Sequence, residues 1–530
     1  MSLAVHVSGR AQAAVAANIA ALVSDRVASR ITAKDFTLWG KDAEAESSIR
    51  LGWVTSATDS QSLVARIIAL RDEFAAKGVN RFVLCGMGGS SLAPEVITQT
   101  AGVELVVLDS TDADQIGHAL AGDIHRTAIV VSSKSGSTVE TDSQKRVFEK
   151  AFTDAGIDKT DRVVIVTDPG SPMEAAAKAD GYRVFNADPT VGGRYSALTA
   201  FGLVPSGLAG VDIQGLLNDA NAVAQLLAED VETNPGLVLG SALARTAAAN
   251  GFRDKVGIIA DGTDIVGFGD WAEQLIAEST GKLGKGILPV ALDVHSAEIG
   301  LDDVLIARIV ANGTVASGDE VAVSGPLGAQ FLLWEYATVI ASRLIGVNPF
   351  DQPDVESAKI AARAMLEKRE VEVAPRFVDG SIEVRSSELS LEGVSDVASA
   401  IAKLLTELPA DGYLAVQAYI DRVDSPEAAE LRNLFAKSTG RPVTFGWGPR
   451  FLHSTGQFHK GGPRFGAYLQ IVARAKHDIA VPGRNFTFGE LIASQAAGDA
   501  NVLAQLGRPV LTLTLGDVTA GLKVIANAAR

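Results

Sequence analysis

From Val79 onward the sequence alternates short apolar segments, typical of buried strands, with glycine- or serine-rich turns and helical segments. The predicted strands of this first block are Arg81–Cys85, Val103–Leu108, Ala128–Val131, Arg162–Thr167 and Tyr182–Phe185. Strands separated by helices form a parallel sheet covered on both faces, and ligands of such sheets bind at the carboxyl ends of the strands. The alternation therefore predicts a doubly wound α/β fold whose ligand site lies in the turns after the strands.

The chain is too long for one compact core, since it has 530 residues. A second alternating block begins with the predicted strand Lys255–Ala260. We expect two doubly wound, mainly parallel sheet domains: residues 1–230, where a helical N-terminal segment precedes the first sheet, and residues 231–530. The strands become shorter after Glu370, so residues 370–530 either complete the second domain or form a separate unit.

The composition narrows the classes of partner. A net charge of −16 argues against binding to nucleic acid or to an anionic membrane. An anionic ligand would therefore need a local pocket of positive potential. The single cysteine, Cys85, excludes an intrachain disulfide, which suits a cytoplasmic protein. The sequence contains no recognisable signal peptide and no apolar run of about 18 residues, so no membrane span is expected.

The turn after the predicted strand Ala128–Val131 reads SSKSGST and leads into a helix. Unpaired backbone N–H groups at a helix start, together with hydroxyls and a cation, can hold a phosphate dianion. The candidate ligands are Ser133, Lys134, Ser135, Ser137 and Thr138. The alternative is an ordinary helix cap, because Ser and Thr are common before helices. Five hydroxyls around one lysine exceed what a cap requires, so we interpret this turn as a phosphate site.

An earlier turn, GMGGSSLAP at residues 86–94, has glycines that allow backbone N–H groups to approach a ligand closely, Gly89 among them. Its spacing departs from the dinucleotide fingerprint G-x-G-x-x-G, because Ser91 stands where the third glycine belongs. A nicotinamide cofactor is therefore not expected.

The stretch WAEQLIAESTGK places Gln274 and Glu278 four residues apart, on one face of a predicted helix that ends at Gly281. A helix dipole disfavours a carboxylate near the C-terminus, which would raise its pKa and suit a general base. The alternative is a solvated surface glutamate.

Three further candidates are Arg194, Gln352 and Lys359. Arg194 lies in the glycine turn VGGRYSALTAFGL, and NPFDQPDVESAK predicts a helix that starts at Pro353. Gln352 and Lys359 are seven residues apart and would face the same way, although a helical ion pair between Glu356 and Lys359 is the simpler reading.

His453 and His459 occur together in GPRFLHSTGQFHKGGP. Histidine titrates near neutral pH and can transfer protons. Two histidines without a cysteine or acidic ligand beside them make a poor metal site, so no metal is expected.

Five motifs resemble those of the phosphoglucose isomerase family. GMGGSSLAP is similar to the family's GIGGSxLGP turn, SSKSGSTVET to its SKTFTTxET phosphate loop and VGGRYSALTAFGL to VGGRxSxxSxxGL. EQLIAESTGK is similar to the signature that ends in ESNGK, and NPFDQPDVESAK resembles FDQxGVExxK. All five occur in the family's order within residues 86–359. The chain also resembles the isomerase part of transaldolase/phosphoglucose isomerase fusions.

The resemblance implies two sugar-isomerase domains in a homodimer. Its substrate would be a hexose 6-phosphate: glucose 6-phosphate and fructose 6-phosphate would interconvert through a cis-enediol, without a metal or cofactor. The implied phosphate ligands are Gly89, Ser90, Ser133, Lys134, Ser135 and Thr138. Glu278 would carry the proton between C2 and C1, and Arg194 would stabilise the enediolate. Gln274 and Gln352 would orient the substrate, and Lys359 would assist ring opening.

Two departures from the family pattern matter. The ring-opening histidine normally follows a Gly-Gln pair before the FDQ motif, whereas here Gly456-Gln457 comes after it; we therefore expect His459 in this role, with His453 as the reserve. Asp354 and Thr280 also replace the usual glycine and asparagine. Two alternatives remain open: an isomerase that also accepts mannose 6-phosphate, and a non-catalytic sensor of sugar phosphates.

Overall fold

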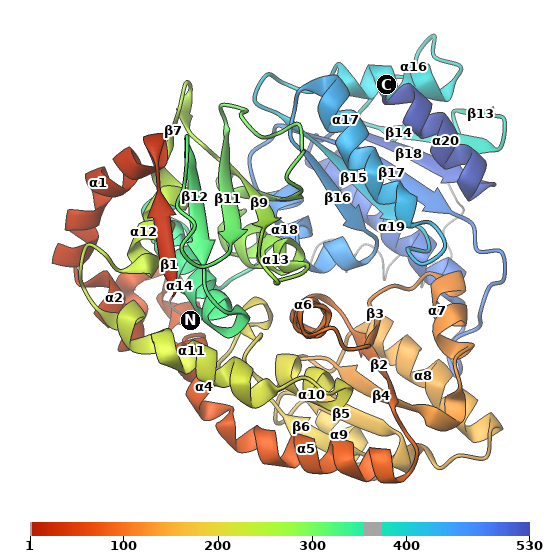
Figure 1. Cartoon of the computed structure of the whole chain (residues 1–530). Coiled ribbons are helices and arrows are strands. Elements are labelled where there is room, and N and C mark those ends of the chain that lie inside the picture. The colour runs from red at the N-terminus through yellow and green to blue at the C-terminus, as the bar shows by residue number, and fades with distance from the viewer. Residues whose placement is uncertain (1–2, 355–359, 361–365, 367–373) are drawn as a thin grey trace.

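The computed structural model describes residues 3–354, 360, 366 and 374–530. It contains three large sheets, each with helices packed on it (Figure 1). Helices α6 (Leu92–Ala101) and α18 (Gly456–Gly461) both contact α13 (Phe268–Thr280), and these three helices lie where the parts of the chain that carry the sheets meet. The predicted mixed α/β class with mainly parallel sheets is confirmed.

The first sheet is entirely parallel and has the order β3-β2-β4-β5-β6. Its strands are β2 (Arg81–Gly86), β3 (Val106–Leu108), β4 (Thr127–Ser132), β5 (Val163–Thr167) and β6 (Arg183–Asn186). Its neighbouring helices are α5 (Gln61–Ala76), α6, α7 (Ala113–Leu120), α8 (Val139–Asp154), α9 (Pro172–Ala179) and α10 (Ala200–Ala209). The central strands are buried on both faces, which explains why they read as continuous apolar runs.

The second sheet has the order β1-β12-β11-β9-β10. Its strands are β1 (Ala4–Val7), β9 (Lys255–Asp261), β10 (Leu288–Leu292), β11 (Val304–Val310) and β12 (Glu320–Ser324), and the helices around it include α1 (Gly9–Ser24), α11 (Ile213–Ala228), α12 (Pro235–Arg245), α13 and α14 (Leu327–Ile345). The N-terminal segment was predicted to be helical, and this is wrong for its first residues, which form strand β1. Strand β1 pairs antiparallel with β12, with Val5 opposite Val323. The second sheet therefore includes a strand from residues 1–230, although its other strands lie in residues 231–530.

The third sheet has the order β13-β14-β18-β17-β15-β16. Its strands are β13 (Phe377–Asp379), β14 (Ile382–Ser387), β15 (Tyr413–Tyr419), β16 (Val443–Trp447), β17 (Gly466–Ala473) and β18 (Val510–Leu515), and its helices are α16 (Val397–Leu405), α17 (Leu431–Thr439), α19 (Phe488–Gln505) and α20 (Val518–Ala528). Strands β15 to β18 are parallel to one another, whereas β14 pairs antiparallel with both β18 and β13. This sheet has a hydrophobic core of its own, built around Leu414, Leu469 and Leu513.

The first two sheets share one core, in which Trp53, Trp271 and Trp334 are buried together with the N-terminal helices. Residues 370–530 add a third sheet to the two that the alternation predicts. The domain boundary near residue 230 stays a prediction.

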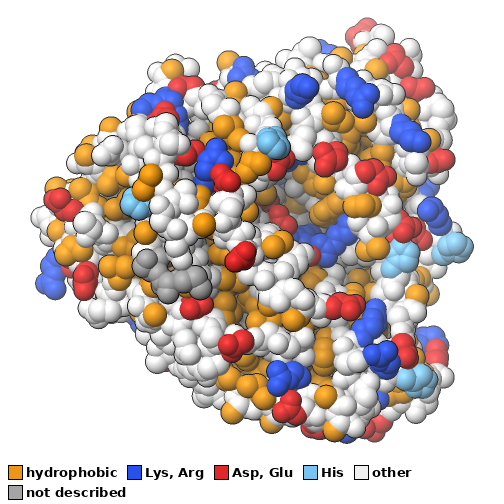
Figure 2. Space-filling view, viewed as in Figure 1, with side chains coloured by type: hydrophobic (Ala, Val, Ile, Leu, Met, Phe, Trp, Pro, Cys, Tyr) orange, Lys and Arg blue, Asp and Glu red, His pale blue; other side chains and the backbone are white. Residues whose placement is uncertain are grey.

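The surface carries both signs of charge. On the face shown in Figure 2, acidic and basic side chains are interspersed and neither forms a continuous patch. Within the described part of the chain, no helix combines the length and apolar character needed to cross a lipid bilayer.

Close packing between helices α11 and α14 gives a first test. A Cβ added at Gly328 would lie 2.0 Å from the Leu216 carbonyl oxygen, a backbone atom that cannot easily move. We expect Gly328→Ala to lower the free energy of unfolding by about 1–3 kcal/mol through overpacking. Gly117→Ala, also in a helix, is the matched control, because its Cβ would meet only Ile479 Cδ1 at 3.9 Å. Thermal unfolding of both variants measures the difference; equal transition temperatures would contradict this account of the packing.

Candidate functional site

Strand β4 ends in the serine-rich turn that was predicted to bind phosphate. The Ser133 hydroxyl lies 3.0 Å from that of Thr138 and accepts the Gly136 N–H at 3.1 Å, so the turn is held by its own side chains. Thr138 is the N-cap of α8, but its side chain makes no capping hydrogen bond. The Thr138 side chain therefore does not cap the amide groups of the first turn of α8, and helix N-termini of this kind can bind an anion. Ser135 lies in the same turn, with its hydroxyl 3.0 Å from that of Ser137.

Lys134 extends from this turn to a carboxylate. Its Nζ lies 2.5 Å from Asp168 Oδ2 and 3.4 Å from the Pro189 carbonyl oxygen. Burial lowers the pKa of Lys134 and raises that of Asp168, and the ion pair only partly opposes both shifts. An anion in the turn would therefore share Lys134 with Asp168.

Glycines allow three separate loops to meet beside this turn. Gly88, Gly89 and the buried Ser90 form a short 3-10 helix before α6. A Cβ at Gly89 would lie 2.1 Å from the Gly193 carbonyl oxygen, and one at Gly88 would lie 2.6 Å from that of His453. Any side chain at these positions would separate the loops. Residues near 194 and 453 therefore reach the same place.

Four of the predicted site residues contact one another at this junction. Arg194 Nη1 donates to Glu278 Oε2 at 3.0 Å and to Gln352 Oε1 at 2.7 Å. Gln274 Nε2 lies 3.4 Å from the same glutamate oxygen and donates to the His453 carbonyl at 2.8 Å. Arg194 and Glu278 are 3% and 7% exposed, so this ion pair is largely removed from water. The expected alternative of a solvated Glu278 is excluded.

Lys282 and Asp351 are parts of this site that the sequence reasoning missed. Lys282 Nζ donates to Asp351 Oδ1 at 2.7 Å and to the carbonyls of Asn348 and Asp351 at 2.7 and 2.6 Å. The Asp351 carbonyl also accepts from Arg194 at 3.1 Å. Lys282 thus holds the loop that presents Gln352. Both residues lie inside quoted motifs, ESTGK and NPFDQ, and this is the only signal that could have marked them.

The two candidate histidines lie in different surroundings. His453 Nε2 is 3.0 Å from Glu140 Oε1, which also accepts from Gln495 at 2.7 Å. His459 is 2% exposed and lies among aromatic rings, with Tyr413 and Tyr468 beside it. Burial shifts the pKa of His459 well below its ordinary value, and Lys460 and Arg508 add to the shift. This placement favours His453 over His459 as the histidine of the site.

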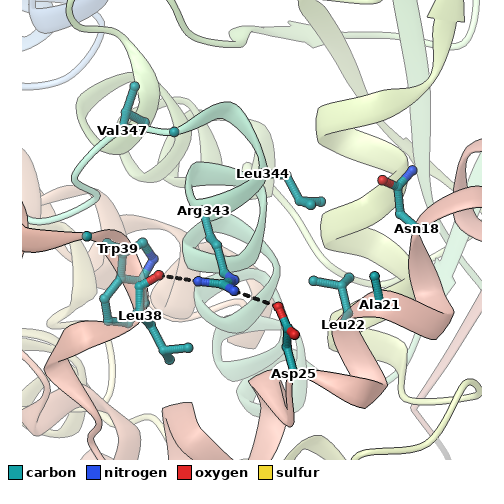
Figure 3. Close-up of a pocket in the computed structure, with 11 residues that line it drawn as sticks. Asn18, Ala21, Leu22, Asp25, Leu38, Trp39, Arg343, Leu344 and Val347 are labelled. Carbon is teal, nitrogen blue, oxygen red and sulfur yellow. Dashed lines mark hydrogen bonds and ion pairs between the residues drawn. The ribbon is translucent and has the colours of Figure 1, made fainter.

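Lys359 lies outside the described residues, as does most of the helix predicted from Pro353 to Arg369. A cavity of about 430 Å³ lies elsewhere, between α1 and the end of α14 (Figure 3). There Arg343 donates to the Leu38 carbonyl and to Asp25, and none of the predicted site residues lines the cavity.

Comparison with known proteins agrees with this geometry. The family model described as phosphoglucose isomerase matches residues 59–303, the stretch that contains Ser133, Arg194, Gln274 and Glu278. This part of the chain is therefore similar to the phosphoglucose isomerase family. A probable glucose-6-phosphate isomerase of Haloarcula marismortui is 29% identical over 365 residues, which cover 58% of this chain and 82% of the relative. A glucose-6-phosphate isomerase of Synechococcus is 28% identical over 375 residues, covering 58% and 70%.

Solved structures show a similar fold. A hypothetical protein from Thermus thermophilus has a TM-score of 0.58 at 25% identity, covering 69% of this chain and 100% of that one. A glucose-6-phosphate isomerase from Chlamydia trachomatis has a TM-score of 0.51 at 21% identity, covering 62% and 75%; at this identity the likeness concerns the fold.

The titration of Lys282 gives a test of the site's electrostatics. Burial, followed by repulsion from Arg194, lowers the pKa of Lys282 from 10.5 to about 8. Between these pH values the Lys282 amine is protonated in the unfolded chain but largely neutral in the folded protein. The free energy of unfolding of the wild type therefore rises with pH, relative to that of Lys282→Met. From about pH 7 to about pH 10 we expect this stability difference to grow by about 2–3 kcal/mol. Urea unfolding at both pH values measures it; a constant difference would show that Lys282 titrates normally.

Proposed function

We propose that this protein catalyses the reversible isomerisation of glucose 6-phosphate and fructose 6-phosphate through a cis-enediol intermediate. The observation that carries the proposal is the buried contact of Glu278 with Arg194, which also binds Gln352. The family match over residues 59–303 and the names of the relatives support the same reaction.

Glu278 is held in a way that suits a base carrying one proton between two neighbouring carbons. Its Oε2 accepts from Arg194 and Gln274, and its Oε1 accepts from no described residue. The carboxylate is thus oriented by one oxygen while the other can remove the proton at C2 and return it at C1. The charge of Arg194 is fixed beside the base, where negative charge develops on the enediolate oxygen.

The phosphate would bind at the start of α8, with hydroxyls supplied by Ser90, Ser133, Ser135 and Thr138. Neither of the two reacting carbons is in the phosphate group, so this binding energy can hold the sugar under Glu278 without taking part in the reaction. A chain of contacts connects the two regions: Glu140 in α8 contacts His453, whose carbonyl accepts from Gln274 next to Glu278. Lys134 would divide its charge between the phosphate and Asp168.

Replacement of the base tests the proposed reaction. We expect Glu278→Gln to lower kcat by about 10³-fold, since general base catalysis contributes on this scale. Glu335→Gln is the matched control: Glu335 is also a buried helical glutamate, and burial alone raises its pKa well above the ordinary value, so the neutral amide closely resembles the native side chain. Fructose 6-phosphate formation is measured in a coupled assay. Turnover by Glu278→Gln at half the wild-type rate or more would exclude this residue as the base.

The histidines allow a second test. A histidine paired with a carboxylate can pass a proton to the ring oxygen of the cyclic substrate, and His453 with Glu140 has this arrangement. We expect His453→Gln to lower kcat at least tenfold with little change in melting temperature, and His459→Gln to lower the melting temperature first, because His459 is packed among aromatic rings. A large loss of kcat in His459→Gln with an unchanged melting temperature, together with little loss of kcat in His453→Gln, would assign ring opening to His459.

Two alternatives can be separated from this proposal. A non-catalytic sensor would bind sugar phosphate without exchanging the C1 or C2 protons with solvent, which NMR in deuterated water detects. The substitution of Thr280 for the family's asparagine is one reason to consider activity on mannose 6-phosphate. The buried Thr280 hydroxyl, however, donates to the Ile276 carbonyl and accepts the Ile287 N–H, which weakens this reason. Turnover measured on glucose 6-phosphate and on mannose 6-phosphate decides whether the specificity is broader.

On the family resemblance we also propose a cytoplasmic homodimer that acts in glycolysis and gluconeogenesis.

A further inference from the structure

Two arginines and three carboxylates form a charged cluster where the three sheet-bearing parts of the chain meet. Arg450 Nη1 lies 2.5 Å from Glu95 Oε2 in α6 and 3.1 Å from Asp109 Oδ2 after β3, and its Nη2 lies 3.3 Å from Asp270 Oδ2 in α13. Arg422, in the loop after β15, contacts the same Glu95 and Asp109 at 3.0 and 3.5 Å. Arg450 thus touches the first and second parts of the chain while belonging to the third.

Glu95 and Arg450 stay charged although both are largely shielded from water. Burial raises the pKa of Glu95, but Arg450 and Arg422 outweigh this effect and the net pKa lies below the ordinary value. Burial likewise lowers the pKa of Arg450, while Glu95, Asp109 and Asp270 raise it further than burial lowers it. Removing one partner would leave an uncompensated buried charge, which is strongly destabilising to the local arrangement.

Arg450 is the first residue of the segment that carries His453. This 3-10 helix, Arg450–His453, presents the His453 carbonyl to Gln274 and its ring to Glu140. In α13, Asp270, Gln274 and Glu278 follow one another at intervals of four residues and so lie along one side of the helix. The guanidinium and the His453 carbonyl therefore contact this side at successive turns, and the second contact is one turn from Glu278.

We propose that Arg450 is a positioning residue for the reaction: it fixes the Arg450–His453 segment against α13 and α6, so that His453 and Gln274 are held in place beside Glu278. As far as turnover is concerned, this inference rests on the proposed function. Arg450 itself would touch no substrate.

The three carboxylates differ in exposure, so we expect their replacement to disturb the Arg450–His453 segment to different degrees. The Glu95 and Asp109 side chains are 13% and 1% exposed. The Asp270 side chain is 52% exposed and lines a cavity of about 260 Å³ with Glu273, Arg432 and Trp447. We therefore expect Asp270→Asn to disturb the segment less than Glu95→Gln does.

Arg450→Lys is the main variant, because it keeps the charge but not the fork that reaches three carboxylates. Arg432→Met is the matched control: Arg432 is also a buried arginine of the third part, and it contacts Glu298 at 2.8 Å in the second part without being in the His453 segment. In wild-type protein we expect Arg450→Lys to lower kcat about tenfold with KM changed less than threefold. In a His453→Gln background, the same change should lower kcat by a smaller factor than in the wild type, because the His453 ring that it positions is already absent.

Hydrogen exchange supplies a readout that does not depend on the reaction. We expect Arg450→Lys to raise amide exchange in residues 448–456 and 268–281, whereas Arg432→Met leaves residues 448–456 at the wild-type rate. Unchanged exchange in residues 448–456 of Arg450→Lys, or an equal loss of kcat with and without His453, would overturn the positioning role. Absence of isomerisation by the wild type would refute the proposed function alone, since the exchange experiment would still decide whether Arg450 holds this segment.

Discussion

Close approach of three backbones at Gly88 and Gly89 is the constraint on which the site depends. The Gly193 and His453 carbonyl oxygens occupy the space that side chains at these two positions would fill. Arg194 follows the first of these carbonyls directly, and His453 supplies the second, so both functional side chains come from backbone that touches the glycine turn. The turn after β2 is thus the place where these loops contact one another, as well as part of the proposed phosphate site.

Electrostatics within this junction are balanced although the chain as a whole carries a net charge of −16. Among the described residues, three cations of the site have a carboxylate partner: Arg194 pairs with Glu278, Lys282 with Asp351 and Lys134 with Asp168. Such pairing keeps the buried cations charged and in fixed positions before a ligand arrives, which is the condition for electrostatic stabilisation without reorganisation. A phosphate dianion at the proposed site would bind to the α8 N-terminus and the nearby hydroxyls, in the presence of the acidic residues Glu140 and Asp142 of the first helical turn.

The sequence predicts those features whose causes are local. The strands of the first sheet are predictable because each is an apolar run bounded by turn residues, and the i, i+4 spacing correctly places Gln274 beside Glu278. Strand β1 is not predictable, because a four-residue segment becomes a strand only through its pairing with β12. The same holds for the Lys282–Asp351 pair and for the environment of His459, since both depend on which distant segments pack together.

The part of the chain that carries the third sheet contacts the FDQ loop at Asp354, one of the residues that depart from the family pattern. Asp354, which stands where the family has glycine, accepts a hydrogen bond from Gln457 Nε2 at 2.7 Å, and its N–H donates to Gln457 Oε1 at 3.1 Å. Gln457 also donates to the Gly281 carbonyl at 2.9 Å, at the end of the helix that carries Glu278. The Gly-Gln pair that occurs late in this sequence therefore reaches the FDQ loop and α13 in space. The carboxylate at position 354 and the displaced Gly-Gln-x-His segment are best explained as one change, in which the third part of the chain supplies a loop to the site and the FDQ loop gains the group that binds it.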